Sequence, residues 1–166
     1  MIIETRRIII RPMEKRDEDD YVLLECSFSF MKSLTESLPM NTTKQIVLDT
    51  LSEGKIEVYS LDNRLDGQYV GYLCIKSKEN GFELGINLMQ KYRGQGYGPE
   101  AIKALTDYLF QSRHITSLTV HIEKNNSHSI HVFEKIGAEY QDESVECPNV
   151  LDIPIYRYQL CLPIGD

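Results

Sequence analysis

The sequence Arg93-Gly94-Gln95-Gly96-Tyr97-Gly98 lies between a stretch typical of a β-strand and one typical of an α-helix. Glycines at such a junction let successive backbone N–H groups turn toward one point, because no Cβ atom obstructs them. The N-terminus of the following helix adds a partial positive charge. This loop is therefore predicted to bind an anion such as a pyrophosphate. The alternative is a flexible turn that only leads into the helix.

The pattern of strands changes at this glycine loop. Before it, apolar stretches separated by the hairpin dipeptides Asp66-Gly67 and Asn80-Gly81 predict an antiparallel meander. After it, a helix and a further strand predict a right-handed crossover to a parallel neighbour. We therefore expect an α/β (α+β) fold with one mixed, mostly antiparallel sheet and a parallel step after residue 98.

The individual elements are predicted from hydrophobic periodicity and from turn and cap residues. The predicted strands are 5–12, 55–61, 68–77, 82–89, 118–122, 140–146 and 155–162. The predicted helices are 17–29, 41–52, 99–113 and 127–136. Asn41 is expected to cap the second of these helices, and Pro99 is expected at the first position of the third.

Length and composition indicate one globular domain spanning residues 1–166. Of the 166 residues, 42% are hydrophobic and 26% are charged, so the chain can bury a core without disulfides or metals. No apolar run approaches the roughly 18 residues of a membrane span, and the first eight residues reach charge too soon for a signal peptide. The cysteines are Cys26, Cys74, Cys147 and Cys161. They have no CxxC spacing, which predicts reduced thiols and a cytoplasmic location.

The formal net charge of −7 argues against a nucleic-acid-binding protein, which needs a basic surface. The charge is unevenly distributed along the chain. Residues 84–135, which include the glycine loop, carry a net +2, whereas residues 1–83 carry −4 and residues 136–166 carry −5. The basic segment therefore coincides with the predicted anion site, and the acidic flanks favour a cationic partner.

Three kinds of phosphate-binding loop were compared with this sequence. A Walker A loop needs Lys followed by Ser or Thr after its last glycine, but Pro99 and Glu100 stand there. A dinucleotide fingerprint would place its third glycine on Pro99, and its fold begins with the loop, whereas hairpins precede the loop here. The pattern Q/R-x-x-G-x-G/A is fulfilled by Arg93, Gly96 and Gly98.

With this loop, the sequence resembles the GCN5-related N-acetyltransferase (GNAT) superfamily, and within it the branch that acetylates ribosomal proteins and small amines. The resemblance covers nearly the whole chain and rests on an ordered set of motifs. These are Thr5-Arg6-Arg7-Ile8-Ile9-Ile10-Arg11-Pro12, Glu83-Leu84-Gly85-Ile86-Asn87-Leu88, Tyr92 to Gly98, Asn126-Ser127-His128-Ser129, Glu134-Lys135-Ile136-Gly137, and Asp152 to Tyr156. The resemblance implies helices on both faces of the sheet.

The resemblance also implies that acetyl-CoA is the cosubstrate and that no metal is required. In the family, backbone amides of the glycine loop hold the pyrophosphate of the cofactor. The corresponding positions are Arg93, Gly94, Gln95, Gly96, Tyr97 and Gly98. Backbone groups matching Ile86, Asn87 and Leu88 pair with the pantetheine arm and polarise the thioester carbonyl. Asn126 matches an asparagine whose side chain contacts the pantetheine.

The resemblance points to Glu83 as the general base that accepts a proton from the amine. A half-buried Glu on a strand is expected to have a raised pKa, as that role requires. The alternative is that Glu83 only orients the substrate or faces solvent. Many relatives have a Tyr as thiolate acid where this chain has Phe133, which cannot donate a proton but stays among the predicted cofactor contacts. Ser129 is the substitute acid, unless it only bonds the helix start or the thiolate leaves unassisted.

Histidine spacing does not predict a metal site. His128 and His131 are three residues apart on a short helix, but no third ligand stands at a credible spacing. His121 lies in the middle of a predicted strand, where a position in the core or at the surface is expected rather than one facing the acceptor.

The sequence thus predicts an N-acetyltransferase that transfers acetyl from acetyl-CoA to a primary amine by direct transfer in a ternary complex. The acceptor is a protein N-terminus or a small-molecule amine, bound by residues 21–45 and 141–154. The alternative is a non-catalytic acyl-CoA-binding or sensor module of the same fold. No nucleic acid or membrane partner is expected, and the chain is a monomer or a homodimer.

Overall fold

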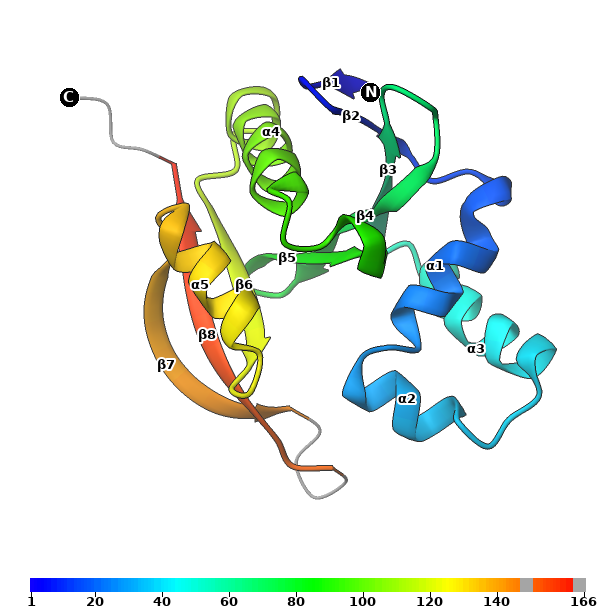
Figure 1. Ribbon diagram of the computed structural model, residues 1–166. Helices are drawn as coiled ribbons and strands as arrows, with labels where there is room; N and C mark the ends of the chain where they lie inside the picture. The colour runs from blue at the N-terminus through cyan, green and yellow to red at the C-terminus, as the bar shows by residue number, and fades with distance from the viewer. Residues whose placement is uncertain (147–150, 163–166) are drawn as a thin grey trace.

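The computed structural model describes residues 1–146 and 151–162, apart from the side chain of Phe30. Its strands form one eight-stranded sheet in the order β1-β2-β3-β4-β5-β6-β8-β7 (Figure 1). The strands are β1 (Ile3–Glu4), β2 (Ile8–Pro12), β3 (Ile56–Asn63), β4 (Tyr69–Lys78), β5 (Gly81–Leu88), β6 (Ser117–Glu123), β7 (Glu139–Glu146) and β8 (Ile153–Cys161). The helices are α1 (Glu18–Glu25), α2 (Ser29–Thr35), α3 (Met40–Ser52), α4 (Tyr97–Ser112) and α5 (Ser127–Lys135), with 3₁₀ turns at Lys15–Asp17 and Gln90–Tyr92.

The predicted mixed sheet is confirmed. Strands β1 to β5 form an antiparallel meander, and β6, β8 and β7 are also antiparallel to one another. Strands β5 and β6 are parallel, and α4 makes the crossover between them. The change from hairpins to a crossover therefore falls at the glycine loop.

Helices cover both faces of the sheet, as expected (Figure 1). One face packs against α4 and α5, in a large core that includes Leu84, Leu105 and Leu118, each at most 1% exposed. The other face packs against α1 and α3, in a smaller core around Val22 and Tyr72. Burying an aliphatic side chain completely stabilises the fold by roughly 1.5–3 kcal/mol, so these two cores hold the helices on the sheet.

Strand β5 contributes to both faces because successive side chains of a strand point to opposite sides. Leu84 is buried in the large core, and Ile86 and Leu88 pack against that core. Glu83 and Asn87 therefore lie on the opposite face, the face of α1. The alternation places the predicted base Glu83 on the same face as Asn87 and on the opposite face from the other two predicted cofactor contacts of β5, Ile86 and Leu88.

Strands β5 and β6 separate soon after they meet. Their ladder consists of the pair Glu83–Thr119, and β5 then continues to Leu88. The amide of Met89 donates to the oxygen of Val70 on β4 at 2.9 Å. Because backbone groups alternate along a strand, those of Ile86 and Leu88 face away from β4, toward the side of β6.

Two helices begin at positions other than those predicted. Helix α3 begins at Met40 after Pro39, so Asn41 is not its N-cap. Helix α4 begins at Tyr97, two residues before Pro99. The left-handed backbone of Gly96 starts this helix early, and Pro99 is tolerated in the first turn because its missing N–H has no partner there.

The predicted helix 17–29 is divided into shorter elements. Helix α1 ends at Glu25, and the hydroxyl of Ser27 donates to the oxygen of Leu24 at 2.6 Å. Such side-chain bonds compete with the helical ones, so the chain turns before α2 begins at Ser29. Helix α2 and the two-residue strand β1 were not predicted, because both are too short to show periodicity.

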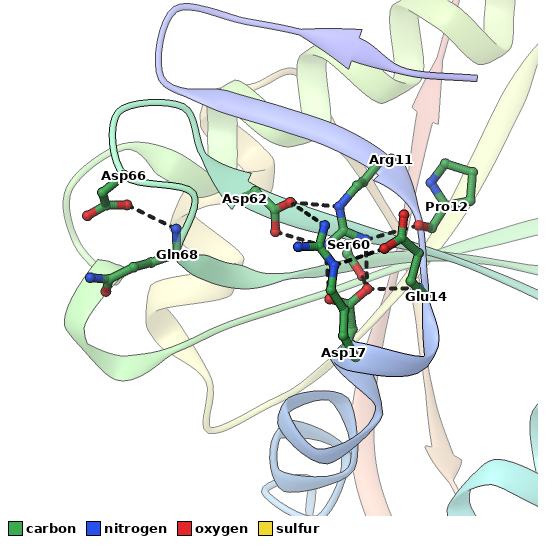
Figure 2. A network of polar contacts seen from close by, with 9 residues as sticks. Arg11, Pro12, Glu14, Asp17, Ser60, Asp62, Asp66 and Gln68 are labelled. Carbon is green, nitrogen blue, oxygen red and sulfur yellow. Dashed lines mark hydrogen bonds and ion pairs between the residues drawn. The ribbon is translucent and has the colours of Figure 1, made fainter.

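A buried network of ion pairs fixes the start of α1 against the sheet (Figure 2). Arg11 on β2 donates through Nε to Asp62 at 2.6 Å and through Nη1 to Asp17 at 2.7 Å. The hydroxyl of Ser60 also donates to Asp17, at 2.8 Å. All four side chains belong to buried residues. Loss of one partner would leave a buried charge uncompensated, so the network anchors the helix whose other end reaches the candidate site.

In the described part of the chain, no helix is both long enough and apolar enough to cross a membrane. Cys26, Cys74 and Cys161 are free thiols. Cys147 lies outside the described residues, as do residues 147–150 of the acceptor-binding segment predicted at 141–154.

Candidate active site

The glycine loop leads from the end of β5 to the N-terminus of α4. Gly94 has a φ of 71° and Gly96 a φ of 82°, in the left-handed region that glycine adopts at little cost. Gly96 is the N-cap of α4. The N–H groups of Tyr97 and Gly98 consequently belong to the first helical turn, where no partner within the helix is available. These open N–H groups and the helix dipole can bind an anion.

Arg93 lies across the end of β5. Its Nε donates to the oxygen of Leu88 at 2.8 Å, and its Nη2 donates to Oδ1 of Asn87 at 3.2 Å. The buried amide of Asn87 in turn donates to the oxygen of Leu24 at 2.9 Å and to the hydroxyl of Ser27 at 3.0 Å. The glycine loop, β5 and the end of α1 are thus connected through one asparagine.

Beyond Glu83, the edge of β5 beside this loop pairs with no strand among the described residues, and the oxygen of Leu88 accepts from Arg93 there. Ile86 and Leu88 direct their backbone groups toward β6, beyond the point where the two strands pair. Backbone groups at such an edge can pair with an extended amide-containing chain as another strand would. The predicted pantetheine contacts of Ile86, Asn87 and Leu88 remain predictions; the backbone groups of Ile86 and Leu88 face this edge, whereas those of Asn87 face β4.

Asn126 and Ser129 lie together at the start of α5. Asn126 is the N-cap, and its Oδ1 accepts from the amide of Ser129 at 3.1 Å. Ser129 therefore takes part in a helix-start hydrogen bond through its backbone, not through its hydroxyl. The acid role of the Ser129 hydroxyl and the cofactor contact of Asn126 stay predictions.

Phe133 lies in the hydrophobic core. It is 3% exposed and belongs to the large core under α4 and α5. Its predicted contact with the cofactor is not tested by this position. An aromatic side chain without a hydroxyl cannot donate a proton, so no acid is present at this point of α5.

The pKa expected for Glu83 was wrong. Its side chain is 13% exposed, and burial alone would raise the pKa. The hydrogen bond with His121 and the charges of Lys76 and Lys78 outweigh burial and lower the pKa to about 2. The lysine Nζ atoms lie 3.9 and 3.4 Å from the carboxylate oxygens. Glu83 is thus a carboxylate held in its charged form, which makes it a weak proton acceptor.

His121 lies beside Glu83, a position that the sequence did not predict. Its Nδ1 lies 3.5 Å from Oε2 of Glu83, and its side chain is 32% exposed. The signal was present in the sequence, because Glu83 pairs with Thr119 and residues 119 and 121 of β6 lie on the same face. That pairing required the register of a parallel ladder, which the sequence pattern did not provide.

Glu25 is a second acidic residue that sequence reasoning missed. It ends α1 and accepts a hydrogen bond from the hydroxyl of Tyr72 on β4. Burial raises the pKa of its carboxyl, against the opposing effects of the Tyr72 hydrogen bond and the charge of Lys76. Two carboxyls with opposite pKa shifts, Glu25 and Glu83, therefore both lie close enough to Lys76 for their charges to act on it.

A search of the described residues finds no group of three or more His, Cys, Asp or Glu side chains arranged to hold a metal ion. His128 and His131 belong to α5 and are exposed. The charged groups of the site are instead carboxylates, lysines and one imidazole, which can carry out proton transfer and charge recognition.

Comparison with protein families matches residues 7–139 to the family described as "Acetyltransferase (GNAT) domain". Two curated relatives are also similar. The "Uncharacterized protein YkkB" of Bacillus subtilis (strain 168) is 28% identical over 89 residues, which are 51% of this chain and 52% of that protein. The chain thus aligns with about half the length of that relative. The "Uncharacterized N-acetyltransferase p20" of Bacillus licheniformis is 25% identical over 143 residues, 80% of this chain and 79% of that protein.

Solved structures share the fold at low sequence identity. An acetyltransferase (GNAT family) from Bacillus anthracis has a TM-score of 0.77 at 21% identity, covering 97% of this chain and 98% of that one. RimL, a ribosomal L7/L12 α-N-protein acetyltransferase in complex with coenzyme A, has a TM-score of 0.77 at 14% identity, covering 98% of both chains. Spermidine N-acetyltransferase from Vibrio cholerae, in complex with CoA and spermine, has a TM-score of 0.76 at 15% identity, covering 95% of this chain and 96% of that one.

Proposed function

The chain belongs to the acetyltransferase (GNAT) family, and on that basis we propose that it transfers the acetyl group of acetyl-CoA directly to a primary amine in a ternary complex. The observation that carries the proposal is the position of the glycine loop beside the open edge of β5. The loop offers N–H groups to a pyrophosphate, and the edge offers backbone groups to the amides of a pantetheine arm.

The reaction forms a C–N bond and breaks a C–S bond. The amine nitrogen attacks the thioester carbonyl, whose developing negative charge is stabilised by the backbone N–H groups of Ile86 and Leu88. A protonated amine loses two protons in all, one before the attack and one from the tetrahedral adduct. The departing thiolate of CoA takes up one proton, from solvent or from Ser129, which solvent then reprotonates, and the second proton is released to solvent. A free thiol has a pKa of about 8.5, so the thiolate can also leave without an acid.

His121 is the proton acceptor that the geometry supports. An alkylamine is mostly protonated near neutral pH, so a base must remove a proton before attack. The imidazole is partly exposed on the face of α1, and Glu83 lies 3.5 Å from its Nδ1. A carboxylate in this position orients the imidazole and leaves Nε2 to accept the proton. Glu83 then acts through His121 and attracts the cationic amine, instead of serving as the base itself.

The acceptor is a primary amine of a protein N-terminus or of a small molecule. Two structural neighbours support this class, since one is a ribosomal-protein α-N-acetyltransferase and another is a spermidine N-acetyltransferase. The acidic flanking segments favour a cationic acceptor among these.

Incubation with acetyl-CoA and a panel of amines tests the proposal. The panel contains polyamines, amino acids, aminoglycosides and peptides with free N-termini. We expect release of CoA thiol together with a mass increase of one acetyl group on at least one acceptor. Tight binding of acetyl-CoA without turnover on the whole panel would instead favour the sensor module.

A further inference from the structure

Arg7 reaches from the N-terminal hairpin to the glycine loop. Its Nη1 donates to the backbone oxygen of Gln95 at 2.8 Å, and its guanidinium lies over the ring of Tyr97, 4.4 Å from the ring centroid. A Cβ atom at Gly96 would lie 3.2 Å from Nη2 of Arg7. Arg7 thus lies against three consecutive residues of the loop, although it stands almost ninety positions earlier in the chain.

The same guanidinium pairs with Glu100 in the first turn of α4. Nε of Arg7 lies 2.7 Å from Oε2, and the backbone N–H of Arg7 donates to Oε1 at 2.9 Å. The hydroxyl of Thr5 also donates to Oε1, at 2.6 Å. Burial would raise the pKa of Glu100, but the hydrogen bonds from Thr5 and Arg7 outweigh it and lower the pKa. Glu100 is therefore charged and surrounded by donors.

A charged carboxylate in this position creates a conflict. It interacts favourably with the dipole of α4, but it repels any phosphate that binds at the same helix end. Arg7 removes the conflict, because it neutralises Glu100 and brings its own positive charge to the loop. A residue outside the glycine motif thereby decides whether the helix end is attractive to an anion.

We propose that Arg7 is a positioning and charge-neutralising residue of the diphosphate site, acting on the loop from Gln95 to Tyr97 and on Glu100. The ligand class is the diphosphate ester of a CoA-type cofactor, so the proposal rests on the proposed function. The proposal predicts that loss of Arg7 weakens CoA binding mainly because the negative charge of Glu100 is then no longer neutralised by an arginine.

Arg64 provides a matched control at the same end of the molecule. Its Nη1 donates to the backbone oxygen of Thr5 at 2.9 Å, and its Nη2 lies 3.2 Å from Oε2 of Glu4. Arg64 therefore holds the same hairpin and carries the same charge, but its contacts are with the hairpin and not with the loop. The backbone N–H of Arg64 donates to the oxygen of Arg7 at 2.8 Å, a bond that the substitution keeps. Arg64→Gln therefore removes one positive charge from this region and leaves the side chains of Arg7 and Glu100 and the loop unchanged.

The experiment titrates CoA into the wild-type chain and four variants by calorimetry. These are Arg7→Gln, Glu100→Gln, the double variant Arg7→Gln/Glu100→Gln, and Arg64→Gln. We expect Arg7→Gln to weaken CoA binding at least about tenfold, as loss of a charge-assisted contact does. The double variant should regain most of that loss, and Arg64→Gln should bind CoA within about twofold of wild type. Because the repulsion is electrostatic, the defect of Arg7→Gln should grow at low salt.

Kinetics and thermal stability separate this role from a merely structural one. Arg7→Gln should raise KM for acetyl-CoA while kcat at saturating acetyl-CoA is kept, and its Tm should match that of Arg64→Gln. Equal CoA affinities of Arg7→Gln and Arg64→Gln would overturn the proposal. So would a double variant as weak as Arg7→Gln alone. If all five proteins, wild type included, fail to bind CoA, the proposed function itself is contradicted.

Discussion

The carboxylate oxygen Oε2 of Glu83 lies 3.5 Å from Nδ1 of His121, on the strand that runs parallel to its own. Two lysines of the neighbouring antiparallel strand, Lys76 and Lys78, approach the same carboxylate. One acidic side chain thus holds three basic groups from two strands. This arrangement determines how the stability should respond to pH and which side chain should matter most for the proposed catalysis.

The stability provided by Glu83 should disappear in acid. Its pKa falls from 4.5 to about 2 on folding, so its contribution is complete above pH 4.5 and is lost as the pH falls toward 2. Glu83→Gln should lower the free energy of unfolding at pH 7 by at most about 3 kcal/mol, and the difference from wild type should shrink below pH 4.5. Urea unfolding at several pH values measures this. Glu79→Gln, in the exposed turn between β4 and β5, is the control, and a pH-independent effect of Glu83→Gln would contradict the prediction.

The rate should depend more strongly on His121 than on Glu83. If the imidazole accepts the proton of the amine, His121→Gln should lower kcat roughly 10²–10⁴-fold, the usual contribution of a general base. Glu83→Gln should lower kcat less, because the base is still present and only its orienting partner is lost. His131→Gln, on the exposed surface of α5, should behave as wild type. A larger loss of kcat in Glu83→Gln than in His121→Gln would restore Glu83 as the base.

Two glycines of the loop should respond differently to alanine. Gly96→Ala places a Cβ in a left-handed backbone and close to Arg7, so it should destabilise the fold by roughly 1–2 kcal/mol and weaken CoA binding. Gly98 is helical, and a Cβ there would make ordinary contacts of 3.7 Å with Leu88 and 3.9 Å with Ile86. Gly98→Ala should therefore keep or raise the Tm. Equal losses of Tm in the two variants would show that the left-handed turn is not required.

The buried network around Arg11 should be essential for folding. Burial would raise the pKa of Asp17, but hydrogen bonds from Arg11, the amide of Glu14 and Ser60 outweigh it and lower the pKa. Asp17→Asn should lower the free energy of unfolding by about 3–5 kcal/mol, because Arg11 loses one of its two buried partners. Chemical denaturation measures the change. Lys15→Gln, at an exposed position of the same turn, is the control and should stay within about 0.5 kcal/mol of wild type.

Glu25 should have the opposite pH response to Glu83. Because burial raises the pKa of its carboxyl, the folded chain holds the proton more tightly than the unfolded chain does. Its charged form therefore opposes folding above the raised pKa, and this penalty is absent below the ordinary value of 4.5. Glu25→Gln should raise the free energy of unfolding at pH 7 and have little effect at pH 4. Destabilisation at pH 7 would contradict this prediction and would mean that the bond from Tyr72 to the charged carboxylate stabilises the fold.

The sequence pattern was sufficient to predict the mixed sheet and the turn of the glycine loop. Period-2 alternation and the dipeptides Asp66-Gly67 and Asn80-Gly81 determine the hairpins locally, and glycines at a strand–helix junction determine the turn. The helix starts were less certain. Helix α4 begins directly after Gly96 and not at Pro99, because the left-handed backbone of Gly96 turns the chain into the helix before the proline is reached.

The charged contacts of the site could not be predicted in the same way. The pKa of Glu83 depends on Lys76, Lys78 and His121, which come from two other strands at a particular register. Helix α1 brings Glu25 to Tyr72 through a turn at Ser27 that has no periodic signal. Arg7 and Glu100 meet only because the first hairpin lies beside the N-terminus of α4. Long-range electrostatics of this kind is a property of the assembled fold.

The separation of β5 from β6 determines how the two parts of the sheet are held together. The meander of β1 to β5 and the three strands β6, β8 and β7 are joined in one sheet by a single parallel pair at Glu83 and Thr119. A pantetheine arm lying in the gap would act as an inserted strand and would bridge the two half-sheets. Amide hydrogen exchange along the free edges of β5 and β6 should then slow when CoA binds. The cofactor would in this way complete the sheet that holds it.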